Sequence, residues 1–271
     1  NFTDEHFWIL FAAVLAIYSI VYSNRAVRNA FLFIISVFLY YKTSGFFFSI
    51  LLFSTVSDYI IGFQIDRSKS GKRKLWLIVS VVINLWVLVY FKYAYFFADS
   101  FNEIFGSAYH PTNVFAAGAN AVFGSTFRVD QILLPVGISF YTFQTLSYSI
   151  DIYREKLKPV KNILDFGFYV SFFPQLVAGP IVRAFDFIPQ LYEKYSLTKK
   201  QFGFAMFWII NGLLKKFLLA DYLAVHFVDS VFSDPIRYNG FENLMALYGY
   251  SLQVYADFSG YTDIAIGVAA L

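Results

Sequence analysis

The chain has 271 residues, of which 58% are hydrophobic and 14% are charged. Soluble domains average about half apolar and a quarter charged residues, so this composition excludes an ordinary water-soluble enzyme. Cysteine is absent, which rules out disulfides and thiolate chemistry, and the net charge of +3 comes from basic residues between apolar runs. That placement favours a membrane topology signal over a nucleic-acid surface, and we predict one membrane domain over residues 1–271.

Apolar runs long enough to suggest membrane helices recur along the whole chain. They cover residues 7–22, 30–41, 45–65, 75–98, 132–153, 202–219 and 244–271. Residues 114–127 contain Gly118 and Gly124 and are more typical of an interfacial or re-entrant element. The pattern predicts an all-α, polytopic transmembrane bundle of roughly six to nine segments.

Basic residues gather in three loops, at 23–29, 66–74 and 154–161. By the positive-inside rule these loops are expected to be cytoplasmic in a bacterial inner membrane protein. This threading requires that residues 30–41 and 45–65 be separate spans turning at 42–44. It also requires that residues 114–127 do not cross the membrane fully.

The stretch 170–189 contains Pro174, Gly179, Pro180 and Pro189, which break a helix and leave backbone groups without intrahelical partners. Such a segment is tolerated at membrane depth only when it is buried in protein or lines a cavity. We therefore expect broken or re-entrant helices around a tunnel.

Ionisable residues inside apolar runs are candidates for function, because a charge in the bilayer centre costs about 2.5–3.5 kcal/mol on insertion scales. Asp58 is read as a hydrogen-bond partner between helices, and Asp151 as one half of an interfacial pair with Arg154. Residues 215, 216 and 221, two lysines and an aspartate, are read as a span terminus at the headgroups.

Asp257 and Asp263 flank a Phe-Ser-Gly-Tyr-Thr segment, and a functional or cavity-lining role stays as open for them as a structural one. The polar strip 139–151 either joins helices or lines a polar tunnel.

No arrangement of residues matches a soluble-type active site. His6, His110 and His226 have no partners at triad or metal-ligand spacing, so no metal site is predicted. No phosphate-binding loop, dinucleotide fingerprint or nucleophile elbow is present either.

Several blocks of the sequence nevertheless have a recognisable order. They are the segment 133–154 (LLPVGISFYTFQTLSYSIDIYR), the segment 172–183 (FFPQLVAGPIVR), the segment 255–267 (YADFSGYTDIAIG), the YFKY motif at 90–93 and the pair Asp58-Tyr59. Together these blocks resemble the membrane-bound O-acyltransferase family, within it the bacterial alginate O-acetyltransferase branch.

The resemblance implies that an activated acyl group, acetyl in this branch, passes to a hydroxyl of an exported polysaccharide. Family members fold as a many-helix bundle around a tunnel, with a histidine as general base. That histidine is expected beyond Leu271, and none of the three histidines here matches it. We therefore expect these residues to be the N-terminal part of the fold, truncated before the catalytic histidine region and inactive alone, with no catalytic residue of their own.

The resemblance and the polar residues at membrane depth together suggest tunnel or structural-network residues, namely Gln144, Tyr148, Asp151, Arg183, Asp257 and Asp263. Arg183 either holds a phosphate or carboxylate of donor or acceptor, or pairs with a buried aspartate. No bound cofactor is expected, and acetyl-CoA or an acyl carrier is the implied donor substrate. Expected partners are membrane lipid, the polysaccharide acceptor and other membrane or periplasmic acetylation proteins, without nucleic acid.

Other functions stay open at this point. Within the family they are peptidoglycan O-acetylation and D-alanylation of teichoic acid. Outside it, broken helices with intramembrane aspartates are also typical of secondary transporters, and an inactive membrane scaffold is a third class.

Overall fold

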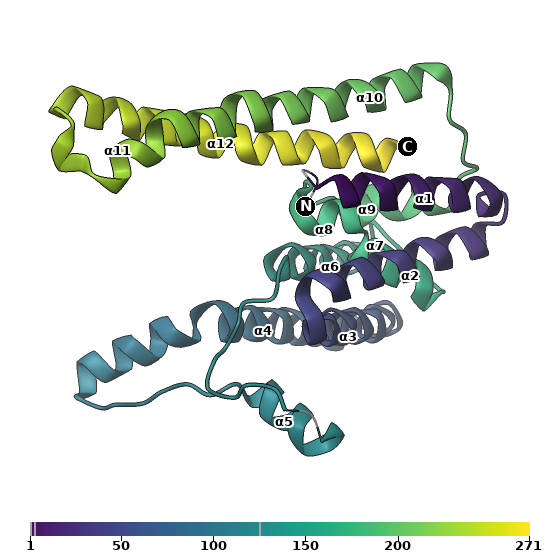
Figure 1. The fold of residues 1–271 in the computed structure, drawn as a ribbon. Coiled ribbons are helices and arrows are strands. Elements are labelled where there is room, and N and C mark those ends of the chain that lie inside the picture. Colours follow the sequence, from purple (N-terminus) through teal and green to yellow (C-terminus); the bar gives the residue numbers. More distant parts are fainter. Residues whose placement is uncertain (1, 3, 125) are drawn as a thin grey trace. The chain divides into compact units, whose positions relative to one another are not determined.

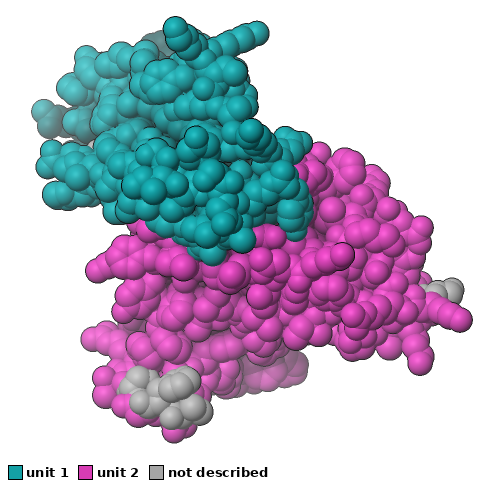
Figure 2. Space-filling view, turned by 90° about the vertical axis from the view of Figure 1, so that its right-hand side faces the viewer, with its two compact units in different colours: residues 1–32, 172–182, 190–271 teal, residues 33–171, 183–189 magenta. Residues whose placement is uncertain are grey.

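The computed structural model describes residues 2, 4–124 and 126–271, and 80% of it is helical, with no strand among those residues. The prediction of an all-α membrane bundle is confirmed (Figure 1). The chain divides into two compact units, coloured separately in Figure 2, and each is described by itself.

The first unit comprises residues 1–32, 172–182 and 190–271. It contains α1 (Glu5–Val21), the start of α2 (Arg25–Ser44), α8 (Phe173–Ala178), α10 (Lys199–Leu214), two π-helical segments η3 (Lys215–Asp221) and η4 (Ala224–Val228), α11 (Asp229–Ser233), the short 3₁₀ turn η5 (Pro235–Arg237) and α12 (Gly240–Ala270).

Small residues bring α10 and α12 into direct backbone contact in this unit. A Cβ atom added to Gly212 would lie 2.5 Å from the carbonyl oxygen of Gly260, and one added to Gly267 would lie 2.6 Å from that of Ala205. Close approach of this kind is how membrane helices compensate for the lack of a hydrophobic driving force between them. Both helices begin with a capping box, at Thr198 and at Asn239.

The second unit comprises residues 33–171 and 183–189. It contains the rest of α2, η1 (Gly45–Phe47), α3 (Phe48–Arg67), α4 (Ser70–Phe105), α5 (Val114–Phe123), α6 (Ile138–Tyr153), α7 (Ile163–Ser171) and α9 (Ala184–Phe187), after which η2 (Ile188–Tyr192) leads back to the first unit. Helices α3, α4 and α6 pack against one another.

Among the residues that the structure describes, three helical stretches are long and apolar enough to cross a membrane, namely Arg25–Arg67, Gly71–Phe105 and Lys199–Ser233. The first of them contains two helices, because α2 ends at Ser44 and α3 begins at Phe48. Two separate helices were expected, but the break lies at Gly45–Phe47, directly after residues 42–44, which are still helical. Helix α5 has 10 residues, too few for the ~20 that a helix needs to cross, as expected for an element that does not cross.

The proline-rich stretch is broken as predicted. Helix α7 ends at Ser171, α8 runs from Phe173 to Ala178, and the chain is then non-helical until Ala184. Proline occupies the first turn of α8, where its missing N–H costs no intrahelical bond. Within the non-helical residues 179–183, Gly179 is buried, whereas Pro180, Ile181 and Arg183 are exposed in this structure, so the expectation that this irregular backbone is enclosed by protein holds only for its first residue.

Candidate functional site

A buried polar network joins three helices of the second unit around Asp58 of α3. This carboxylate is fully buried and accepts hydrogen bonds from Ser80 Oγ at 2.5 Å, Asn84 Nδ2 at 2.6 Å and Ser149 Oγ at 3.1 Å. Thr145 of α6 donates in turn to Asn84 Oδ1 at 2.9 Å. The interpretation of Asp58 as a satisfied partner between helices is confirmed.

Ser80 and Asn84 were missed as members of this network. They lie four residues apart in the apolar run of α4 and therefore share one face of that helix. That spacing was the available signal, because two polar residues on one face of a membrane helix need a partner across the bundle.

A second network links α6 to α7 and α9. The hydroxyl of Tyr169 donates to the carbonyl oxygen of Gln144 at 3.1 Å and lies 3.1 Å from Ser147 Oγ. Ser147 Oγ also accepts a hydrogen bond from the backbone N–H of Ala184 at 3.3 Å. Gln144, one of the predicted residues, is buried in this network. It lies one turn from Ser147, which contacts the start of α9 after the broken segment.

Tyr148 is a packing residue with a polar tip. Its ring lies close against Gly62, since a Cβ atom added to that glycine would be only 2.8 Å from the ring. The ring also packs on Phe166, with the two ring centroids 4.2 Å apart. Its hydroxyl accepts a hydrogen bond from the backbone N–H of Val160 at 3.2 Å. Tyr148 thus ties the loop that follows α6 to the helix bundle.

Asp151 and Arg183 differ from the pairings that were expected. Asp151 is buried, yet within the described part of the chain its Oδ2 atom has no hydrogen-bond partner and no ion pair joins it to Arg154. Arg154 caps the end of α6 and is exposed, so its side chain is solvated instead. Arg183 is also exposed, and no described carboxylate lies within ion-pair distance of it.

Charged residues of the first unit form a set of ion pairs between α10, η3 and α12. Lys215 Nζ lies 2.6 Å from Asp263 Oδ2 and donates to Ser259 Oγ at 2.9 Å, while Asn211 donates to the same Asp263 oxygen at 2.7 Å. The Asp263 side chain is only 7% exposed, so its charge is well shielded from solvent.

The adjacent Lys216 binds two further carboxylates. Its ammonium lies 2.6 Å from Asp257 and 2.6 Å from Asp221, and it sits 5.4 Å from the ring centre of Tyr261. The two lysines and Asp221 were expected to lie at the lipid headgroups, at the end of a membrane span. The ion pairs of the lysines with Asp257 and Asp263 of α12 were not expected. Asp257 and Asp263 are both held by lysines, and the π-helical turns of η3 lie where the pairing occurs. Such π-turns frequently mark functional sites.

The predicted residues therefore belong to separate clusters. Gln144, Tyr148, Asp151 and Arg183 lie in the second unit, and Asp257 and Asp263 lie in the first. Within each unit, the contacts of the paired residues are of the kind that fixes helices against one another. Their assignment to a tunnel stays a prediction.

No family model matches the chain. Among curated proteins, it is 38% identical to a probable alginate O-acetylase of Pseudomonas aeruginosa, over 100% of this chain and 49% of that protein. It is 30% identical to a peptidoglycan O-acetyltransferase of Helicobacter pylori, over 90% of this chain and 48% of that protein. A teichoic acid D-alanyltransferase of Bacillus subtilis is 29% identical over 49% of this chain and 34% of its own length.

Several of these relatives match the whole of this chain, yet the chain spans only about half of their length. It corresponds to their N-terminal half. The matched region includes the polar strip of α6, the broken segment and the aspartates of α12. The chain belongs to the membrane-bound O-acyltransferase family, and within it to the alginate O-acetylase branch.

Proposed function

We propose that this chain supplies the N-terminal membrane portion of an O-acyltransferase that transfers acetyl groups to hydroxyls of an exported polysaccharide, as in alginate O-acetylation. The observation that carries this proposal is the similarity over the entire chain to a probable alginate O-acetylase at 38% identity. The buried networks support the proposal, because they fix helices against one another, as the scaffold of a reaction that must exclude water requires.

The general base is proposed to be a histidine outside these 271 residues, so that the chain alone is inactive. A neutral imidazole with a pKa near 6.5 is suited to take a hydroxyl proton at working pH. His6 and His110 are exposed, and His226 stacks on Tyr222 with ring centroids 4.2 Å apart. None of these three side chains takes part in the hydrogen bonds described around Asp58 and Tyr169 or in the ion pairs of Lys215 and Lys216.

The proposed enzyme receives its acyl group from acetyl-CoA or an acyl carrier on the cytoplasmic side of the inner membrane and meets the polysaccharide on the outer side. Other membrane or periplasmic acetylation proteins are its proposed partners. The proposed orientation is supported by the basic loops 23–29, 66–74 and 154–161, which favour the cytoplasmic side by the positive-inside rule.

The test is a chromosomal deletion of the gene in its own organism, with quantification of three kinds of ester. These are acetyl esters on exported polysaccharide, acetyl esters on peptidoglycan, and D-alanyl esters on teichoic acid. We expect loss of the polysaccharide esters alone and their return on complementation with the whole gene. Three unchanged ester pools would contradict the proposal.

Peptidoglycan O-acetylation is the second candidate, because the Helicobacter pylori peptidoglycan O-acetyltransferase is 30% identical over 90% of this chain. In that case the same deletion removes acetyl groups from muropeptides and leaves the exported polysaccharide unchanged. The teichoic acid alternative rests on a match to half of the chain and predicts loss of D-alanyl esters.

A further inference from the structure

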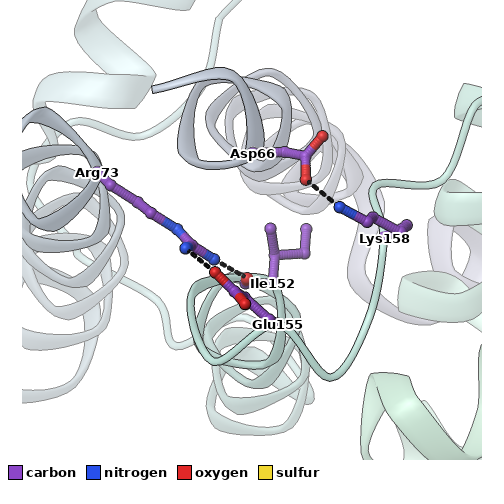
Figure 3. Close-up of polar contacts among 5 residues, drawn as sticks. All are labelled: Asp66, Arg73, Ile152, Glu155 and Lys158. Atoms are coloured by element: carbon purple, nitrogen blue, oxygen red, sulfur yellow. Dashed lines mark hydrogen bonds and ion pairs between the residues drawn. The ribbon is translucent and has the colours of Figure 1, made fainter. Parts of the chain in front are cut away.

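Two basic loops of the second unit lie side by side although they are distant in sequence. One joins α3 to α4, and the other follows α6 (Figure 3). The Arg73 guanidinium pairs with the Glu155 carboxylate and donates to the carbonyl oxygen of Ile152 at 2.8 Å. Lys158 Nζ lies 3.1 Å from Asp66 Oδ1. These contacts hold the two loops beside each other.

The remaining cations of these loops form what we call the basic rim. All of its members are exposed, and in the described chain none forms an ion pair; they are Arg67, Lys69, Lys72, Lys74, Arg154, Lys156 and Lys161. The acidic residues within the two loops, Asp66 and Glu155, are already paired with Lys158 and Arg73. The rim therefore carries an uncompensated positive charge.

Exposed apolar side chains lie directly beside the rim on the same helices. Leu75 follows Lys74 in sequence and is 57% exposed, and Ile78 one turn further along α4 is 47% exposed. Ile60 of α3, less than two turns before the loop, is 52% exposed. In a membrane protein such side chains meet acyl chains, which places the rim at the depth of the lipid headgroups.

We propose that the basic rim binds the phosphate groups of anionic phospholipids. The surface combines cations at headgroup depth with an apolar wall below them, which is the chemistry of a whole phospholipid. Clustered Lys and Arg beside membrane helices contribute about 1 kcal/mol each to binding of anionic lipid. An acidic protein partner would match the charge alone and would leave the apolar wall unused.

The experiment uses the whole protein purified in zwitterionic detergent and titrated with phosphatidylglycerol, with the melting temperature as readout. Wild-type protein is expected to gain stability with phosphatidylglycerol and not with phosphatidylcholine. The triple variant K69Q/K72Q/K74Q is expected to bind roughly 100-fold more weakly, since three contributions of about 1 kcal/mol are lost. The matched triple variant K69R/K72R/K74R keeps the charge and should keep the response.

A control variant, K194Q/K199Q/K200Q, removes the same charge from exposed positions of the first unit. It is expected to respond to phosphatidylglycerol as the wild type does. Equal loss of response in both glutamine variants would overturn the proposal, because the attraction would then be general. A rim that responds to poly-glutamate but not to phosphatidylglycerol would also overturn it, in favour of an acidic protein partner.

Discussion

Asp58 is held by donors from α4 and α6, and it is buried completely. The two carboxyl oxygens of Asp58 accept hydrogen bonds from two serine hydroxyls and one asparagine amide. The sequence indicates the aspartate because a charge in an apolar run is rare. It does not indicate the partners, because these depend on how α4 and α6 are rotated against α3.

The substitution Asp58→Asn tests this network. An amide keeps only one acceptor oxygen, so whichever way it is turned at least one of the donors Ser80, Asn84 and Ser149 loses its acceptor, at a cost of about 1–3 kcal/mol. The reciprocal double variant D58N/N84D restores one donor and one acceptor and should recover part of the lost stability. Thermal melting in detergent measures both variants.

The exposed Asp99→Asn, also on α4, is the matched control and should leave the melting temperature unchanged. Equal melting of the single and double Asp58 variants would show that the complementarity of the pair does not stabilise the bundle.

Glu155 gives a prediction of pH dependence for the paired loops. Its hydrogen bond from Arg73 lowers the pKa of the carboxyl below the usual glutamate value. The contribution of this pair is therefore complete above the unfolded-state pKa of about 4.3 and is lost as the pH falls through the lower folded-state pKa. Glu155→Gln should melt below the wild type at pH 7, and the difference should vanish in acid.

Since the carboxylate is exposed, this difference should be small and should shrink further in high salt. A difference in melting temperature that stays constant from pH 7 to pH 3 would contradict the assigned role of the carboxylate.

At the scale of elements, the contact of α10 with α12 depends on glycine. The sequence predicts both helices, and it marks Gly260 as a place for close backbone approach, but the opposing Gly212 is identified only once the two helices are in register. The same register brings Lys215 to Asp263 and Lys216 to Asp257. From the sequence alone these lysines are expected at the headgroups, because partners more than 40 residues along the chain leave no local signal.

Gly260→Ala should separate these helices. Its new Cβ would lie 2.8 Å from the carbonyl oxygen of Gly212, which is backbone and cannot rotate away. We expect a loss of about 1–3 kcal/mol, typical of overpacking, measured by thermal or denaturant unfolding in detergent.

Gly203→Ala is the matched control, because a Cβ atom there meets nothing within 4 Å. Alanine favours a helix by about 1 kcal/mol over glycine, so this variant should be neutral or slightly stabilised. Destabilisation by both alanines to the same extent would contradict the importance of the close contact.

For the whole molecule, composition and hydrophobic runs are enough to predict an all-α membrane protein, and prolines are enough to predict the broken segment. Rotation and pairing of helices are not predictable in this way, since apolar side chains cover most faces of each helix. Asp151 illustrates the limit, because its burial without a partner at Oδ2 contradicts the simple expectation of a pair with the nearest arginine.

The topology gives a prediction at this scale. The ion pairs between the loops place residues 66–74 and 154–161 at the same end of the second unit. Reporter fusions after Lys74 and after Lys161 should therefore report the same side of the membrane, and the positive-inside rule predicts that this side is cytoplasmic. A periplasmic signal from either fusion would overturn this topology.

The ion pairs of the first unit have a consequence for synthesis of the protein at the ribosome. Lys215 is made 48 residues before its partner Asp263. Lys216 meets Asp221 only five residues later, but at about 5–20 residues per second Lys215, at the start of η3 directly after α10, waits several seconds for its carboxylate. An isolated lysine at the centre of a membrane helix costs about 2.5–3.5 kcal/mol on insertion scales. We therefore expect α10 to leave the translocon only together with α12, so that the hairpin enters the lipid as one piece.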